Sequence, residues 1–162
     1  MSNETLITSV DPPTSSVMTS GDTDMTTQIT QHVLVPIADQ EDARTTAQTI
    51  EPYEFERITV LHVVEKGEGV PDKTPVEQSK QIAAEAFAAF RETFPDAEKE
   101  ITYRRDVVKG IVEVADEIDA TAIVFRPRGR ARILQWLAGD RSLRLLMEAD
   151  RPVISVPEGT SG

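Results

Sequence analysis

The stretch from Ile123 to Ser142 reads IVFRPRGRARILQWLAGDRS and decides the fold class. Its short apolar run ends at Phe125 and passes into an arginine-rich turn, in which nine residues separate Gly129 from Gly139. Glycines just past the carboxyl end of a strand let backbone N–H groups approach an anion closely, and a following helix adds the positive end of its dipole. The spacing is therefore typical of a phosphate-binding loop in an α/β protein.

Strands and helices alternate along the rest of the chain. Apolar runs predict strands at residues 32–38, 58–64, 101–106, 122–125 and 152–156. Helical periodicity predicts helices at 42–50, 76–94, 108–118 and from 139 onward, the last with Leu143, Leu146 and Met147 at helical spacing. Such alternation requires a parallel sheet, whose ligand crevice lies at the carboxyl ends of the strands where their order reverses. If the first and fourth strands flank that point, Ala38, Asp39 and residues 126–129 line the crevice.

Composition limits the function. The 162 residues support one domain, and with no Cys and two His the chain has neither a disulfide framework nor a His-rich transition-metal site. A formal net charge of -11 opposes binding to nucleic acid and to anionic membranes. Arg outnumbers Lys by twelve to five, and with abundant acids this predicts a halophilic surface suited to multimolar salt, as in haloarchaea. With neither a signal-peptide pattern nor a long apolar run, the protein is expected to be cytoplasmic and not inserted in a membrane.

The ends of the chain differ from its middle. Residues 1–30 hold thirteen Ser or Thr, four acids and no Lys or Arg, with isolated apolar residues such as Leu6, Ile7 and Val10. This composition predicts a disordered tail, with a docking or modification segment as the alternative. The folded domain is predicted at 31–158 and a disordered carboxyl terminus at 159–162.

Four ordered segments resemble the universal stress protein family: VLVPIA from Val33, TVLHVVE from Thr59, RDVVKGIVEVADE from Arg105 and RPVISVP from Arg151. The resemblance covers nearly all of 32–157. It implies a Rossmann-like, adenine nucleotide alpha hydrolase-like sheet of five parallel strands in the order 3-2-1-4-5, with helices on both faces. It also implies a homodimer formed through the last strand, at Val153, Ile154, Ser155 and Val156. Pairing of this strand with its copy would cover the exposed edge of the sheet.

The resemblance implies an ATP or AMP site with Mg²⁺, and the chain departs from its pattern. Gly129 and Gly139 match the second and third loop glycines, but Arg126 replaces the first and Asp140 replaces the hydroxyl residue that follows the third. The resemblance implies an Asp directly after the first strand. That position is Ala38 in this chain, and Asp39 lies one residue later. Asp140 would place a carboxylate where phosphate oxygens lie, at a cost of about 1 to 4 kcal/mol in a partly solvated site. The expected nucleotide or anion site comprises Ala38, Asp39, Val64, Arg126, Arg128, Gly129, Arg130, Gly139 and Asp140.

Seven of the twelve arginines lie between Arg126 and Arg151. Either several guanidinium groups converge on the crevice as an anion site, or they lie on the surface and pair with Asp140, Asp150 and the acids of a partner subunit. His62 lies in a buried strand, and neither His has neighbours that predict a nucleophile or an acid/base pair. The sequence thus predicts no catalytic residue and no metal ligand.

Three functions remain open. The first is a non-catalytic, dimeric universal-stress-type regulatory or protective protein with weak or lost ATP binding. The second is an ATP- or AMP-binding protein with slow hydrolysis, in which Asp39 or Asp140 would help to hold Mg²⁺. The third is a soluble regulatory companion of a membrane transporter.

Overall fold

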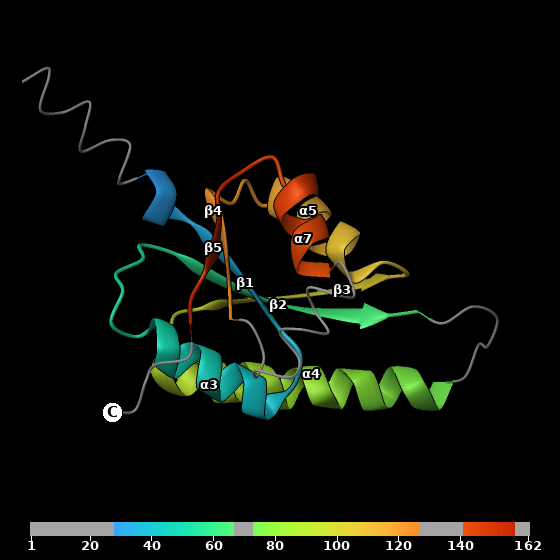
Figure 1. Cartoon of the computed structure of the whole chain (residues 1–162). Helices are drawn as coiled ribbons and strands as arrows, with labels where there is room; N and C mark the ends of the chain where they lie inside the picture. The colour runs from blue at the N-terminus through green and yellow to red at the C-terminus, as the bar shows by residue number, and fades with distance from the viewer. Residues whose placement is uncertain (1–27, 67–72, 127–140, 158–162) are drawn as a thin grey trace, which may run out of the picture.

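The computed structural model describes residues 28–66, 73–126 and 141–157. Its five strands are β1 (Val33–Ile37), β2 (Ile58–Glu65), β3 (Glu98–Arg104), β4 (Ala122–Phe125) and β5 (Val153–Ser155). All pairings are parallel and the strand order is β3-β2-β1-β4-β5, which confirms the predicted fold (Figure 1). Val33 of β1 faces Ile58 on one side and Ala122 on the other, so the order reverses between β1 and β4.

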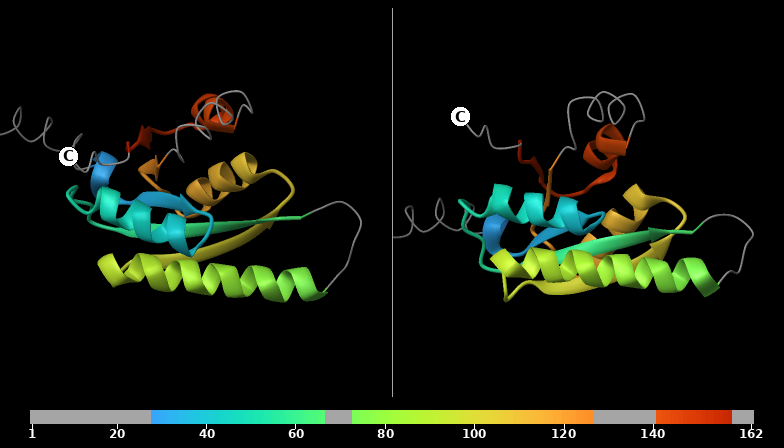
Figure 2. Two further views of the ribbon diagram at one scale, coloured as in Figure 1. Left: turned by 60° about the horizontal axis from the view of Figure 1, so that its bottom comes forward. Right: turned by 90° about the horizontal axis from the view of Figure 1, so that it is seen from below.

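Helices cover both faces of this sheet (Figure 2). One face carries α3 (Gln40–Ile50) and α4 (Lys73–Thr93), and the other carries α5 (Val107–Glu117) and α7 (Arg141–Glu148). Alternate residues of a strand point to opposite faces, so each strand of the middle of the sheet supplies both layers. Val33 and Val35 pack toward α3 and α4, while Leu34 packs toward α5.

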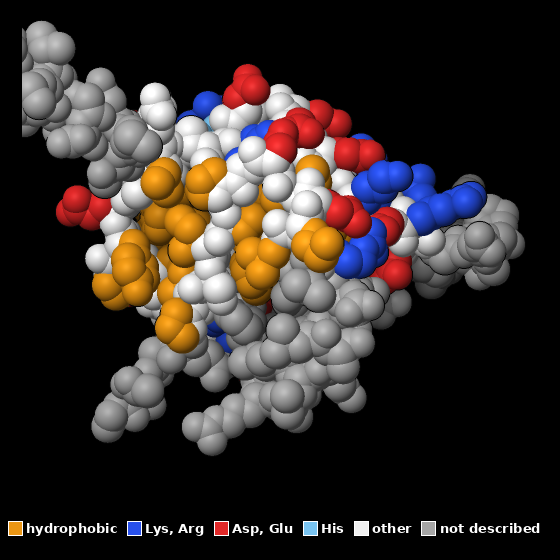
Figure 3. Space-filling model, turned by 45° about the horizontal axis from the view of Figure 1, so that its top comes forward, with side chains coloured by type: hydrophobic (Ala, Val, Ile, Leu, Met, Phe, Trp, Pro, Cys, Tyr) orange, Lys and Arg blue, Asp and Glu red, His pale blue; other side chains and the backbone are white. Residues whose placement is uncertain are grey.

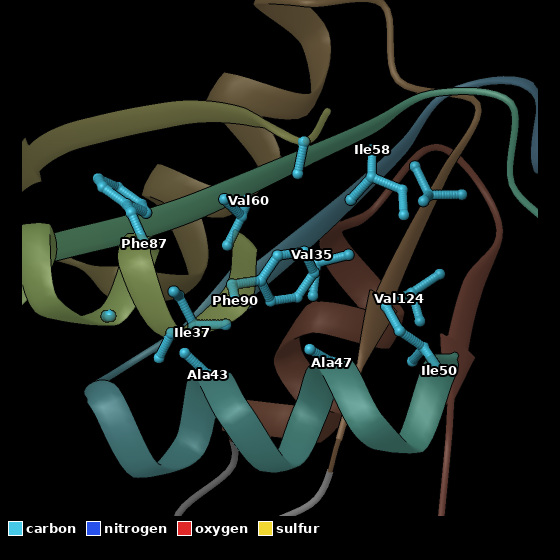
Figure 4. Close-up of a cluster of buried hydrophobic side chains, with 14 of the residues drawn as sticks. Val35, Ile37, Ala43, Ala47, Ile50, Ile58, Val60, Phe87, Phe90 and Val124 are labelled. Carbon is cyan, nitrogen blue, oxygen red and sulfur yellow. The ribbon is translucent and has the colours of Figure 1, made fainter. Parts of the chain in front are cut away.

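The larger core cluster lies between the sheet and the helices α3 and α4 (Figure 4). Phe90 of α4 is fully buried there, between small side chains such as Ala43 and Ala47 of α3. The predicted apolar stripe of this helix is confirmed, because Ala83, Ala86, Phe87, Ala89 and Phe90 are all buried. Small residues on α3 let the two helices lie close side by side, and the short connection after β1 places the amino end of α3 beside the carboxyl end of that strand.

The predicted apolar face of the last helix is wrong. Leu145 of α7 is buried, whereas Leu146 and Met147 are 54% and 76% exposed, and the Leu143 side chain lies outside the described residues. The inward face is set by packing against α5, where Leu145 belongs to the same cluster as Val108 and Ile111. Spacing alone could not select this face, because adjacent apolar residues lie on both sides of the helix.

The amino end of the sheet is closed by a polar cluster, and residues 28–31 form a helical turn ahead of it. The Thr121 hydroxyl donates to the carbonyl oxygens of Ile29 and His32, at 3.0 Å each, and accepts from the His32 N–H at 2.9 Å. The His32 ring lies 2.8 Å from the Thr59 hydroxyl, and burial is the main cause that lowers its pKa. These bonds hold the chain before β1 against the start of β4.

Candidate functional site

A cavity opens at the carboxyl ends of β1, β2 and β4, where the strand order reverses. Its volume is about 230 Å³. Its walls are mainly apolar side chains from the sheet, α5 and α7, with a few polar groups; the residues are Pro36, Ile37, Ala38, Asp42, His62, Val63, Glu65, Val107, Val108, Ile111, Phe125, Arg126 and Leu145. The cavity lies where an open α/β sheet binds its ligand.

Asp42 lies in the first turn of α3, at the rim of this cavity, and is buried although it is an acid. One carboxylate oxygen, Oδ2, accepts a hydrogen bond of 2.9 Å from the Ala38 N–H. The Asp42 N–H in turn donates to Asp39 Oδ1 at 2.9 Å, so Asp39 caps the amino end of α3. The local sequence thus fixes the carboxylate of Asp42 at the end of β1.

Arg126 follows β4 directly and reaches across to α3. Its NH2 group donates to Asp42 Oδ1 at 2.9 Å, and the two side chains are only 7% and 8% exposed. Its Nε donates to the Thr46 hydroxyl, one turn further along α3, at 3.3 Å. A buried ion pair therefore links the ends of the two strands that flank the switch in strand order.

Of the predicted site residues, the structure brings Ala38 and Arg126 together at the cavity. Asp39 does not line the cavity, because its carboxylate serves as the cap of α3. Val64 is half-buried and also lies outside the cavity lining, while its neighbours Val63 and Glu65 line it. The other predicted residues, Arg128, Gly129, Arg130, Gly139 and Asp140, lie outside the described residues.

Two further arginines of the predicted cluster form internal ion pairs. Arg144 of α7 donates to Asp106 Oδ2 at 2.7 Å, and this bond holds the pKa of the Asp106 carboxyl below its ordinary value. Asp106 also caps the amino end of α5. Arg151 donates to the carbonyl oxygens of Ala115 and Ala120, at 2.7 and 2.6 Å, and pairs with Asp116 and Asp150. Arg144 thus links α7 to the start of α5, and Arg151 links the end of α5 to the segment just before β5.

His62 is 7% exposed and lines the cavity, so it is both a core residue and a wall of the site. Within the ranges that the structure describes, no cluster of three or more His, Asp or Glu could hold a metal ion. Across the same ranges, no helix has the length and apolar character needed to cross a membrane.

Sequence reasoning missed Asp42. An acid in the first turn of a helix is common, since it interacts favourably with the helix dipole, and nothing in a single sequence distinguishes a buried one. A usable signal was the spacing of Asp39 and Asp42, because an acceptor three residues after an N-cap residue is the pattern of a capping box.

The sheet order and the cavity at its switch point define an open α/β protein with a ligand crevice. A family model described as the universal stress protein family matches residues 30–157. The chain therefore belongs to the universal stress protein family. A search of the curated proteins found no match.

Solved structures share this fold at low sequence identity. The universal stress protein from Archaeoglobus fulgidus in complex with dAMP is 22% identical, with 79% of this chain and 98% of that one covered and a TM-score of 0.57. A universal stress protein in complex with cAMP is 19% identical, with 80% and 98% covered and a TM-score of 0.54. The universal stress protein UspA from Lactobacillus plantarum is 22% identical, with 78% and 97% covered and a TM-score of 0.56.

Proposed function

We propose that this protein is a non-catalytic regulatory or protective member of its family, in which ATP binding is weak or lost. The buried ion pair between Arg126 and Asp42 carries the proposal. In the family pattern a glycine at position 126 would leave room for phosphate near the backbone. Here the residue is an arginine, whose guanidinium group is held by the Asp42 carboxylate.

The energy of this pair works against a phosphate ligand. A phosphate that draws Arg126 away would remove this ion-pair partner from the buried Asp42 carboxylate, and breaking a buried ion pair costs about 3 to 5 kcal/mol. A phosphate that leaves the pair intact would gain little attraction from Arg126, because the Asp42 carboxylate already neutralises the guanidinium charge. A cost of about 3 kcal/mol corresponds to more than a hundredfold in affinity.

A nucleotide-binding function is the second candidate. It is favoured by the family relatives whose structures are complexes with dAMP and cAMP. In this case a nucleotide would enter the cavity with its base among apolar walls such as Val108 and Phe125. Slow hydrolysis or a required Mg²⁺ would belong to this second candidate.

Calorimetric titration separates the two candidates. ATP, ADP and AMP are titrated in turn into the full chain, in ~2 M KCl with Mg²⁺, at protein concentrations that would reveal a Kd up to the millimolar range. The proposed function predicts no binding tighter than millimolar. Micromolar binding of any of the three nucleotides would favour the nucleotide-binding candidate.

The proposal includes a homodimer formed through β5. This strand pairs with β4 and ends the sheet, and its residues Val153 and Ile154 are half-buried. Sedimentation equilibrium of the full chain should give a dimer that dissociates on dilution. An Ile154→Lys substitution should weaken the dimer at least tenfold, whereas Val76→Lys, at an exposed apolar residue of α4, should not. A parent chain that stays monomeric at all concentrations would disprove the dimer.

A further inference from the structure

The outer edge of β5 is one of the two open edges of the sheet among the described residues, the other being the outer edge of β3. In a parallel ladder the N–H and C=O of one residue point to the same neighbouring strand, and the next residue points to the opposite side. The Pro152 carbonyl accepts from Ile123 and the Val156 N–H donates to Phe125, so residues 152, 154 and 156 face β4. The N–H and C=O groups of Val153 and Ser155 therefore face outward.

Exposed apolar side chains lie on α7, which precedes β5 in the chain, and on the helical turn bound to the start of β4. Figure 3 views the molecule from the side of β5 and α7 and shows hydrophobic side chains gathered on this face, with charged side chains toward one end. Leu146 and Met147 lie on α7, which leads directly into β5, and both are exposed. Ile29 is 38% exposed and is bound through its carbonyl to Thr121, the residue that precedes β4. The outward N–H and C=O groups of Val153 and Ser155 favour an added strand at this edge.

The chain enters the described structure beside this edge. Because Thr121 holds Ile29 at the start of β4, residues 1–27 are joined to the fold next to the strand that pairs with β5. Between residue 10 and residue 28 there are enough residues to reach about 60 Å when extended, and a three-residue strand spans only about 10 Å. Any segment near residue 10 can therefore reach the edge of β5 within its own molecule.

One segment in that range has the composition of a strand. Residues 5–10 read TLITSV, with four β-branched residues in six, and Asp11, Pro12 and Pro13 follow directly. Leu6, Ile7 and Val10 give this segment apolar side chains. Since proline lacks an N–H, the two prolines end the segment.

We propose that residues 5–10 bind the open edge of β5 as an added strand and so compete with a second copy of the chain for Val153 and Ser155. The competition rests on the proposed dimer, while the binding of residues 5–10 does not. A flexible tether gives an effective concentration near millimolar, far above a micromolar protein concentration. If residues 5–10 leave the edge of β5 unoccupied in one molecule in ten, the apparent dimerisation constant weakens about a hundredfold, because a dimer needs two unoccupied edges.

Amide hydrogen exchange of Val153 and Ser155 in the full chain tests the proposal. At micromolar concentration these amides should be protected, and the protection should not depend on concentration, because the partner is in the same molecule. Ile7→Asp should make their exchange at least tenfold faster and should tighten dimerisation in sedimentation experiments. The matched control Val17→Asp makes the same charge change outside the segment and should alter neither.

The outcomes separate this proposal from the proposed dimer. Equal exchange in the parent and in Ile7→Asp at micromolar concentration would overturn the binding of residues 5–10. Protection that appears only as the concentration rises would assign the edge to a second copy alone and would also overturn it. Loss of protection in Ile7→Asp without any dimer at higher concentration would uphold the binding of residues 5–10 and disprove the dimer.

Discussion

Removal of the Arg126 guanidinium should destabilise the fold more than removal of any exposed arginine. Arg126→Met keeps much of the side-chain volume but leaves the Asp42 carboxylate buried without this ion-pair partner. Breaking one side of a buried pair costs about 3 to 5 kcal/mol, a large part of the 5 to 15 kcal/mol that holds an ordinary domain folded. The control is Arg57→Met. Its pair with Glu98 has side chains 56% and 49% exposed, so its loss should lower the free energy of unfolding far less.

Urea unfolding followed by circular dichroism, in ~2 M KCl, measures both variants. The midpoint should fall in Arg126→Met at an unchanged slope, since the surface exposed on unfolding stays the same. The double variant with Asp42→Leu should recover most of the loss, because two apolar side chains of similar volume often replace a buried pair without penalty. If Arg126→Met loses no more than Arg57→Met, the pair is not the buried, interacting unit described here.

Three further changes test the surrounding structure. Asp39→Ala should lower the free energy of unfolding by about 1 kcal/mol, measured by urea unfolding, because α3 loses its cap. Gly110→Ala should destabilise by about 1 to 2 kcal/mol in the same assay, despite better helix propensity, since its Cβ would lie 2.9 Å from the Arg104 Cγ. Because burial lowers the pKa of His32 in the folded chain, the unfolded chain binds more protons than the folded chain at mildly acidic pH. The stability that this group contributes is therefore complete above pH 6.5 and is lost as the pH falls toward the pKa of the folded chain. A melting temperature that falls between pH 7.5 and 5.5, and falls less in His32→Gln, would confirm this; identical slopes would contradict it.

The arrangement of strands and helices could be predicted from the sequence, because buried parallel strands and amphipathic helices leave strong periodic patterns. The apolar run before Asp39 and the stripe of α4 are such patterns, and both lie where they were expected. The face of α7 could not be predicted, because the choice between Leu145 and its neighbours depends on packing against α5.

The candidate site could be located but not described from the sequence. The switch point between β1 and β4 follows from the strand order, and Ala38 and Arg126 lie there as expected. The partner of Arg126 is 84 residues earlier in the chain, and such a long-range ion pair leaves no local pattern. Asp42 reads as an ordinary acid at the start of a helix until the fold places it opposite a guanidinium group.

The central claim is that the pair between Asp42 and Arg126 closes the crevice to nucleotide phosphates. The most direct test is calorimetric titration of ATP with Mg²⁺ into the double variant Asp42→Ala with Arg126→Gly, which opens the crevice and leaves no buried charge behind. Asp140→Ser, which keeps the pair, is the matched variant. The double variant should bind ATP at least tenfold more tightly than the parent and more tightly than Asp140→Ser, which removes only the carboxylate of the loop. An Asp140→Ser variant that binds as tightly as the double variant, or a parent that does so, would contradict the claim.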